Sequence, residues 1–250
     1  MKLLLLLLFF AIGSISFGQK FDKEIICSTD TLVVFPIVSM KQPIEHSESE
    51  EKESYKIVKC RTCTNFGYQI EIGFSKYYYG EKTYSWIGNH GGPDFGLSLF
   101  IYNINLGARF KPWTTNPKKE MIFNGQVIPT TIKFNPTKID YYIGYSINLE
   151  KLWSVQPYFG YNRSSFEILE ADEIYKNFEF DKTGGIIFGV TTNKYFKMKD
   201  YEFLSIFSSI GYGLIDFEKI HPDLDNNYFE WTIGIAYKGF AIRRFNKKIE

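Results

Sequence analysis

The run Ile139-Asp-Tyr-Tyr-Ile-Gly-Tyr-Ser-Ile-Asn-Leu149 shows which fold class this chain adopts. Apolar and aromatic residues fill its odd positions, and small or polar residues, with Tyr142, fill its even positions. Strict alternation over this length is typical of a β-strand with one apolar face. After a short polar break at 150–152, the alternation resumes from Trp153 to Tyr161. Two such runs joined by a few residues pair antiparallel, so the region predicts a β-hairpin.

The polar face of this hairpin indicates which side of the sheet meets water. A face turned to bulk solvent is normally rich in Lys and Glu, whereas this face carries Gly, Ser, Asn, Gln and Tyr with one charge, Asp140. Small neutral residues suit the lumen of a narrow barrel, and an apolar face that includes Tyr and Trp suits a lipid-facing wall. We therefore predict a transmembrane β-barrel. The alternative is a soluble secreted barrel of lipocalin type, whose apolar face would enclose a hydrophobic ligand.

Composition restricts the classes of function. The 250 residues carry 29 Lys and Arg against 28 Asp and Glu, which gives a net charge of +1. A net charge this small gives no positive electrostatic potential that would favour the binding of nucleic acid. After the N-terminus, no apolar run reaches the roughly 20 residues of a transmembrane helix. The mean hydropathy of -0.19 fits a barrel, in which half of each strand is polar.

The N-terminal segment has the layout of a secretory signal. A positive start is followed by an apolar core at 3–12 and small residues before Gln19, as in exported proteins. We expect residues 1–18 to be a signal peptide and residues 19–67 to form a periplasmic extension. Within this extension, the acidic run 45–53 is expected to be a solvated linker.

All three cysteines lie in this expected extension. Disulfides are permitted after export, so we expect one structural disulfide among Cys27, Cys60 and Cys63, with the pairing left open. Cys60-Arg-Thr-Cys63 also has the C-x-x-C spacing of a redox motif or of half a zinc site. No βαβ context supports redox chemistry, and His46 is a poor further zinc ligand.

Alternation predicts eight antiparallel strands within residues 68–245, an up-and-down barrel followed by a tail at 246–250. The expected strands are 68–79, 95–110, 120–134, 139–149, 153–161, 183–195, 201–216 and a last strand that starts at Tyr228. The segment 120–134 alternates poorly and contains Pro129, and it is included because the strand count and directions then agree.

This assignment sorts the connections between strands into two ends. Breaks at 111–119, 150–152 and 196–200 fall at one end, and longer breaks at 80–94, 164–182 and 217–227 fall at the other. Short periplasmic turns and long external loops are typical of outer-membrane barrels. The short break at 135–137 is the exception, because it would lie at the external end.

Two motifs resemble a known family. Gln156-Pro-Tyr-Phe-Gly-Tyr161 resembles the Pro-Tyr-x-Gly element of small outer-membrane barrels, and Trp231-Thr-Ile-Gly-Ile-Ala-Tyr237 resembles their last strand. The chain therefore resembles the OmpA/OmpX-like eight-stranded barrels, in the style found in Bacteroidota, over residues 68–245. The resemblance implies the outer membrane of a Gram-negative cell and insertion by the outer-membrane assembly machinery, but no single activity. The residues after Phe245 and the cysteine-containing extension depart from the family pattern.

Few residues suggest catalysis. His90 and His221 fall in expected external loops, and Ser85 and Ser164 are the nearest candidate nucleophiles. No G-x-S-x-G motif is present. We therefore expect no catalytic residues, and a lipid-modifying barrel enzyme is the alternative.

The charges of the expected connections are distributed unevenly. The expected external loops hold Glu167, Glu170, Asp172, Glu173, Glu179, Asp181, Glu218, Asp223 and Asp225; the expected periplasmic turns hold Lys111, Lys118, Lys119, Lys151, Lys197 and Lys199. Acidic loops can bind Ca²⁺ or Mg²⁺, with Asp223, Asp225, Asn226 and Asn227 as the best ligands. We expect instead a solvated surface with no metal and no cofactor.

Glu71 and Arg109 face the lumen on strands expected to be adjacent, and a pair between them would block a channel. The sequence thus predicts a non-enzymatic outer-membrane barrel with a structural or loop-binding role, in which a pore is disfavoured. Its expected partners are outer-membrane lipid, lipopolysaccharide and the assembly machinery. We expect a monomer and no nucleic acid.

Overall fold

The structure is a computed structural model, and it describes residues 26–34, 55–123, 125–150, 152–169, 180 and 182–249. The expected signal peptide at 1–18 and the acidic run 45–53 lie outside the described residues. The same holds for Lys151, Glu170, Asp172, Glu173, Glu179 and Asp181 of the charged connections.

The described chain is almost entirely strand, as period-two alternation predicts. Its strands are β1 Ile26–Val34, β2 Tyr55–Tyr79, β3 Gly91–Ile101, β4 Ile104–Pro112, β5 Met121–Phe123, β6 Gln126–Ile128, β7 Lys133–Tyr145, β8 Ile147–Glu150, β9 Trp153–Leu169, β10 Thr183–Lys199, β11 Glu202–Ile215 and β12 Asn227–Ile249. A short helix, α2 Glu81–Ile87, and a 3₁₀ turn, η2 Phe217–Lys219, lie in the connections. Within these described residues, no helix is long and apolar enough to span a membrane.

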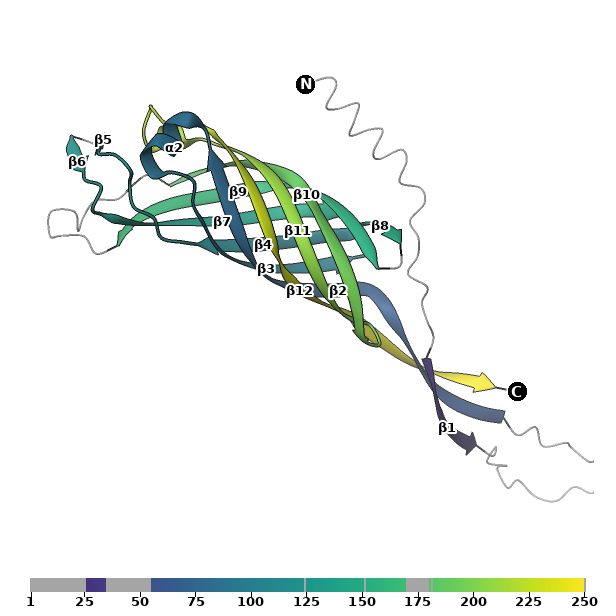
Figure 1. The fold of residues 1–250 in the computed structure, drawn as a ribbon. Coiled ribbons are helices and arrows are strands. Elements are labelled where there is room, and N and C mark those ends of the chain that lie inside the picture. Colours follow the sequence, from purple (N-terminus) through teal and green to yellow (C-terminus); the bar gives the residue numbers. More distant parts are fainter. Residues whose placement is uncertain are drawn as a thin grey trace, which may run out of the picture. The chain divides into compact units, whose positions relative to one another are not determined.

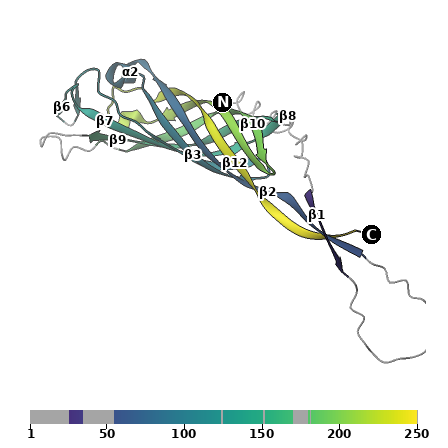
Figure 2. The ribbon, with the colours of Figure 1, turned by 60° about the horizontal axis from the view of Figure 1, so that its bottom comes forward.

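Eight strands close into a barrel. Their order is β2, β12, β11, β10, β9, β7, β4 and β3, and β3 pairs back with β2. The neighbouring strands for which a register is resolved are all antiparallel. Figure 1 shows the strands running obliquely around the ring, and Figure 2 shows the same arrangement after a rotation.

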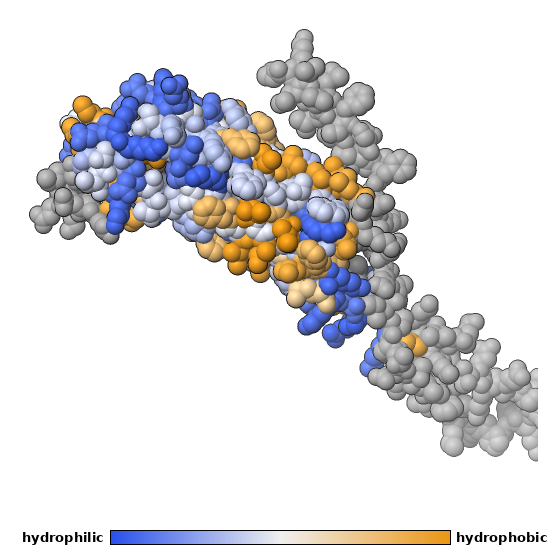
Figure 3. Space-filling model, viewed as in Figure 1, coloured by the Kyte–Doolittle hydropathy of each residue, from blue (hydrophilic) through white to orange (hydrophobic). Residues whose placement is uncertain are grey.

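The barrel is apolar outside and polar inside. On β11, Leu204, Ile206 and Ile210 are exposed, whereas Ser205 and Ser209 between them are fully buried. The other barrel strands repeat this alternation, and Figure 3 shows hydrophobic residues over the barrel wall and hydrophilic ones over the end that carries α2. A lipocalin-type barrel would have the reverse arrangement, so that alternative is wrong. An exposed apolar wall of this kind suits lipid rather than water.

Two of the expected strands are wrong, but the expected number of eight barrel strands is right. The segment 95–110 is not one strand but the hairpin of β3 and β4, in which Ile101 stands opposite Ile104. Tyr102 takes a positive φ of 57° in its turn. The outward positions are odd-numbered in β3 and even-numbered in β4, because residues on either side of a two-residue turn face the same side of the sheet. The expected single strand did not allow for this change of phase. The segment 120–134 supplies only the small β5–β6 hairpin and the start of β7, and the barrel still has eight strands.

This correction moves one connection to the other end of the barrel. The expected turn at 111–119 belongs to the long connection between β4 and β7, and the expected break at 135–137 lies within β7. Long connections follow β2, β4, β9 and β11, and we call this the long-loop end. The short connections from β3 to β4, from β8 to β9 and from β10 to β11 occupy the opposite, short-turn end. Lys118 and Lys119 therefore lie at the long-loop end, and Lys111 lies in the barrel wall.

A second compact unit consists of residues 20–64 and 241–250, in which β1 pairs with the first residues of β2. Cys27 stands opposite Cys60 in this pairing, and Cys60 is disulfide-bonded. β12 continues to Ile249, where the sequence predicted a tail after Phe245.

Candidate functional site

Arg109 and Glu71 form the lumen ion pair that alternation predicted. Arg109 Nε donates to Glu71 Oε2 at 2.9 Å, and each side chain is 2% exposed. The strands that carry them, β4 and β2, are not adjacent as expected, because β3 lies between them. Gly96 of β3 pairs with both residues, and a Cβ there would approach Glu71 Oε2 to 2.7 Å. The missing side chain at Gly96 is what lets the ion pair cross a whole strand.

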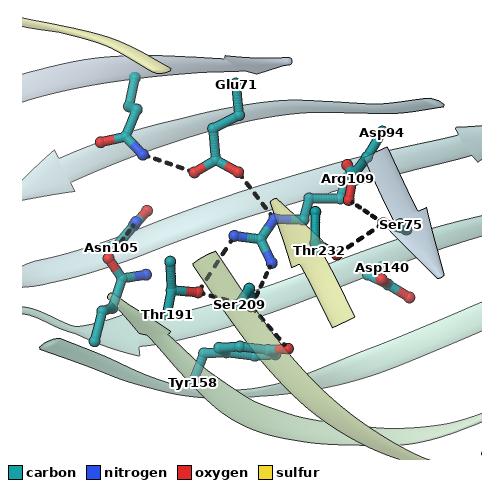
Figure 4. Close-up of polar contacts among 12 residues, drawn as sticks. Glu71, Ser75, Asp94, Asn105, Arg109, Asp140, Tyr158, Thr191, Ser209 and Thr232 are labelled. Atoms are coloured by element: carbon teal, nitrogen blue, oxygen red, sulfur yellow. Dashed lines mark hydrogen bonds and ion pairs between the residues drawn. The ribbon is translucent and has the colours of Figure 1, made fainter. Parts of the chain in front are cut away.

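Each of the three nitrogens of the Arg109 guanidinium donates a hydrogen bond. Its other two nitrogens donate to Ser209 Oγ at 3.3 Å and Thr191 Oγ1 at 3.4 Å, as Figure 4 shows. Glu71 accepts a second hydrogen bond, from Gln69 Nε2 at 2.7 Å. Because both charges are paired and hydrogen-bonded, the cost of burying them inside the barrel is offset.

A second ion cluster lies in the lumen around Lys111. Its Nζ donates to Asp140 Oδ2 and, at 2.7 Å, to Glu230 Oε1, and Asp94 Oδ2 lies 4.0 Å away. These residues come from β4, β7, β12 and β3, so the cluster ties together strands on different sides of the ring. Asp140 also accepts a hydrogen bond from Asn162 Nδ2. Lys111, expected in a periplasmic turn, is instead a fully buried lumen residue.

The buried charges of the lumen balance. Among the described residues, the buried acids are Glu71, Asp94, Asp140 and Glu230, and the buried Lys and Arg residues are Arg109, Lys111, Lys138 and Lys238. The numbers of buried acidic and basic side chains in the ring are therefore equal. Such a lumen is held together by attraction between its walls and contains no ring of like charge that would select an ion.

Tyr158 of the Pro-Tyr motif fills the lumen from β9. Its hydroxyl lies 2.6 Å from the positions that a Cβ would take at Gly189 and Gly211. The ring therefore lies across β10 and β11, and only glycine allows this close approach. The Tyr158 ring also lies 5.6 Å from the Arg109 guanidinium carbon. The motif thus serves packing within the lumen.

Two lumen lysines lie against aromatic rings. Lys138 Nζ is 3.6 Å from the ring centroid of Tyr228 and 3.9 Å from that of Tyr77. Lys238 Nζ is 4.0 Å from the ring centroid of Phe100. Desolvated cation–π contacts of this kind stabilise a buried ammonium. Lys138 therefore contacts the aromatic residues Tyr77 and Tyr228 at the long-loop end of the lumen.

The long-loop end is closed by a hydrophobic core of its own, which we call the cap. Its buried residues are Tyr77, Tyr79, Trp86, Ile87, Trp113, Met121, Phe123, Ile128, Ile132, Phe134, Phe166, Phe180, Ile215, Phe217, Ile220, Leu224 and Tyr228. They come from α2, the β5–β6 hairpin, η2 and the ends of several barrel strands. Trp86 is central and has the rings of Phe123, Phe134 and Phe166 within 5.8 Å, centroid to centroid.

Asp225 attaches α2 to the loop between β11 and β12. Its Oδ2 accepts from Lys82 N at 2.7 Å, and its own N–H donates to Thr83 Oγ1 at 2.9 Å. The carboxylate thus satisfies N–H groups in the first helical turn. Asn226 bonds to Glu218 in the same loop, through both the Glu218 N–H and its carboxylate. Asp225 and Asn226, expected as the best metal ligands, are engaged within the protein, and the described residues contain no group of three or more His, Cys, Asp or Glu able to hold a metal.

His90 is buried in the cap rather than exposed in a loop. Its Nε2 lies 3.2 Å from Tyr79 Oη, and its ring packs against Tyr77 and Trp113. Burial, assisted by the charge of Lys138, lowers the pKa of His90 to about 3. The imidazole is therefore neutral at physiological pH.

The structure does not bring the other catalytic candidates to His90. His221 Nδ1 accepts from Asp223 N at 3.2 Å, and its ring packs against Phe123. Ser85 Oγ donates to Lys82 O at 2.7 Å, and Ser164, expected in an external loop, is a buried lumen residue that donates to Asn162 Oδ1 at 2.6 Å. Neither hydroxyl has a histidine as its hydrogen-bond partner among these contacts.

The outer surface of the cap presents an apolar pair beside a polar hollow. Ile122 and Val127 stand opposite each other on the β5–β6 hairpin and are 62% and 47% exposed. Beside them lies a hollow of about 470 Å³, bordered by Lys82, Lys119 and Asp223. Exposed apolar residues with polar neighbours are typical of interaction sites.

The apolar wall, the charge-balanced lumen and the closed ring define the class of the protein, an eight-stranded transmembrane β-barrel. No protein-family model matches the chain, and no curated protein matches it. Among solved structures it is similar to Neisserial surface protein A (TM-score 0.44, 12% identity, covering 71% of this chain and 97% of that one). It is also similar to Ail of Yersinia pestis, solved with the heparin analogue sucrose octasulfate (TM-score 0.43, 14% identity, 70% and 99% covered). A third similar structure is the outer membrane protein OprG of Pseudomonas aeruginosa (TM-score 0.42, 9% identity, 72% and 98% covered). The likeness is one of strand arrangement among small outer-membrane barrels, and nothing about ligands follows from it.

The cap was not predicted. Many of its residues come from connections without periodicity, so alternation could not assign them to a core. The signal that was present is the aromatic content of the expected connections, in which Trp86, Trp113, Phe123 and Phe180 are too apolar for solvated loops.

Proposed function

We propose that the chain is a monomeric integral protein of the outer membrane, with its long-loop end outside the cell. In this proposal the lumen does not conduct, the protein is not an enzyme, and the cap provides a structural or binding surface at the cell envelope. Insertion would use the outer-membrane assembly machinery, as for other exported barrels.

The cap is the observation that carries this proposal. Connecting loops are usually solvated and variable, whereas these connections enclose a buried aromatic core and hold α2 and the β5–β6 hairpin in place. An ordered platform of this kind presents Ile122 and Val127 without the entropic cost of ordering a loop on binding. The geometry therefore favours recognition by the cap over passage through the barrel.

Two further features support a closed, non-catalytic barrel. The lumen contains paired charges and large rings at the level of Arg109 and Lys111, as expected for a narrow barrel filled by side chains. His90 hydrogen-bonds to the Tyr79 hydroxyl and His221 to the Asp223 backbone, and neither of these bonds reaches Ser85 or Ser164.

Epitope insertion tests the orientation. A short tag placed beside Gly125, where a Cβ would meet nothing within 4 Å, should be stained by antibody on intact cells. The matched control carries the same tag between Tyr102, which is 71% exposed, and Asn103 in the short turn at the other end. Staining of the control should require permeabilisation. The reverse pattern would refute the orientation.

Planar-bilayer recording tests the closed lumen. The purified, folded protein should give no stable conductance steps, because paired charges and large rings occupy the lumen at the level of Arg109 and Lys111. A reproducible open level in the wild-type protein would contradict this part of the proposal.

A further inference from the structure

The outer wall of the barrel has a notch where β3 begins and β4 ends. Its volume is about 470 Å³, and its lining includes Phe74, Pro93, Pro112 and Trp113, with Thr114 and Asn135 at its polar side. The lining is mainly apolar. The notch lies in the wall and not in the lumen, since Phe74 is 54% exposed on the outward face of β2.

The local sequence explains why the wall is indented here. The hydrogen-bond ladder between β3 and β4 stops at the pair Phe95 and Phe110. Continuing the same register would place Pro93 opposite Pro112, and neither residue has an N–H to donate. The outward position Gly91 has no side chain, and a Cβ there would come within 2.4 Å of Ser75 O. The notch is thus a gap in the layer of outward side chains that glycine and two prolines create.

The position of the notch indicates what fills it. Directly towards the middle of the wall lie the outward residues Ile72, Phe95 and Phe110, each between 45% and 54% exposed. These residues belong to the apolar wall, so the notch opens to lipid chains at the edge of this wall nearest the long-loop end. Such a depression beside a lipid-facing surface would lose packing contacts if it stayed empty.

A cation stands beside the notch. Lys76 is the next outward residue after Phe74 on β2, it pairs with Gly91 across the β2–β3 ladder, and it is half-buried. It forms no ion pair with any residue that the structure describes. A lysine at the edge of an apolar wall is at the right level for a lipid phosphate.

We propose that the notch holds an acyl chain of lipopolysaccharide, with the ammonium of Lys76 against a phosphate of its lipid A. The choice of lipopolysaccharide over phospholipid rests on the orientation proposed above, which places the notch at the outer leaflet. The chemistry is complementary, because the apolar gap takes methylene groups and the lysine takes the adjacent negative charge.

Native mass spectrometry of the protein extracted from its own outer membrane tests the proposal. The wild-type protein should retain a bound mass equal to one lipopolysaccharide molecule. Lys76→Gln should lower the bound fraction about fivefold, as expected for one lysine at a lipid surface. Thr114→Trp, which fills the notch, should abolish it, and Asn135→Phe serves the same purpose if Thr114→Trp fails to fold.

Two matched controls separate this site from general lipid contact. Lys194→Gln removes a lysine that lies on the Trp153 ring, 4.6 Å from its centroid, and Val190→Phe enlarges an outward residue elsewhere on the wall. Both should retain lipopolysaccharide at the wild-type level, and every variant is first shown to be folded by heat-modifiable migration on gels. No retained lipid in the wild type, equal retention by all variants, or retention of phospholipid in place of lipopolysaccharide would overturn the proposal. The epitope experiment tests the orientation separately, so a failure of the orientation and a failure of the site give different results.

Discussion

At the scale of single residues, Arg109 shows how the lumen tolerates buried charge. Its nitrogens bond to Glu71, Ser209 and Thr191, and the Tyr142 ring lies 5.0 Å from its guanidinium carbon. The pair contributes to stability only while it is complete, since each charge would be costly to bury alone.

Arg109→Met should therefore lower the free energy of unfolding by about 3–5 kcal/mol, because it leaves Glu71 buried without its cation. Glu71→Gln in the same chain should recover most of this loss, since the uncompensated charge is then gone. Urea unfolding of the protein in lipid vesicles measures both values. If the double variant were as unstable as Arg109→Met, the loss would be one of packing and not of charge.

The lowered pKa of His90 predicts that the stability of the cap depends on pH. Its pKa of about 3 in the folded cap lies below the value of about 6.5 in water. A lowered pKa means that the neutral imidazole stabilises the closed cap above pH 6.5, and that this stability is lost as the pH falls towards 3. Between pH 6.5 and 5 the cap should lose about 2 kcal/mol. The relevant facing groups are Lys138 and Lys76, whose charges also disfavour protonation.

Hydrogen exchange of the cap amides at pH 7 and pH 5, corrected for the intrinsic exchange rates, measures this loss. His90→Phe removes the titrating group and should abolish the dependence, whereas His221→Gln should leave it in place. An equal dependence in wild type and His90→Phe would assign it to another group.

At the scale of elements, α2 depends on a residue from a distant loop. Asp225→Ala removes the carboxylate that accepts from Lys82 N and should weaken the helix by about 1 kcal/mol. Faster exchange confined to the amides of α2 would show this effect. Asp223→Ala is the matched control, because the Asp223 side chain is 79% exposed and its ion pair is with His221 and not with α2.

The β5–β6 hairpin should be dispensable for barrel closure. β4 pairs directly with β7 from Ile104–Tyr145 to Pro112–Thr137, so the ring does not need residues 117–130. Replacing these residues by a short Gly-Ser linker should keep heat-modifiable migration and detergent-dependent extraction, and should expose Trp86 to aqueous quenchers. Loss of the folded gel band would show that the cap is needed for the barrel itself.

The second unit predicts a specific disulfide. Cys60 is disulfide-bonded and stands opposite Cys27 in the β1–β2 register, and residues paired in this way lie within bridging distance. Mapping of non-reduced proteolytic peptides should therefore find Cys27 joined to Cys60, with Cys63 alkylated. A peptide that joins Cys60 to Cys63 would contradict the register.

At the scale of the whole molecule, inward side chains from strands far apart in the sequence meet inside the ring. The Lys111 and Glu230 side chains are separated by 119 positions in sequence and meet at 2.7 Å. Together with the cap, these contacts make the barrel a supported platform whose wall meets lipid and whose long-loop end presents α2 and the β5–β6 hairpin.

Much of this architecture could be predicted from local patterns. Period-two alternation identified the class of barrel, the apolar outer wall and the inward positions of Glu71 and Arg109, because side-chain direction along an extended strand depends only on neighbouring residues. The same pattern predicted the hairpin of β7 and β9 and the positions of the longer connections after β2, β9 and β11.

Tertiary structure alone decided the rest. The use of 113–132 as part of a cap, the contacts of Lys111 across the lumen and the contact of Asp225 with α2 all depend on residues far apart in the chain. Alternation carries no information about which inward side chains meet across a ring, or about how non-periodic connections pack on one another. Those choices are made by burial and charge pairing once the strands have closed, and they determine both the side chains that fill the lumen and the cap at its long-loop end.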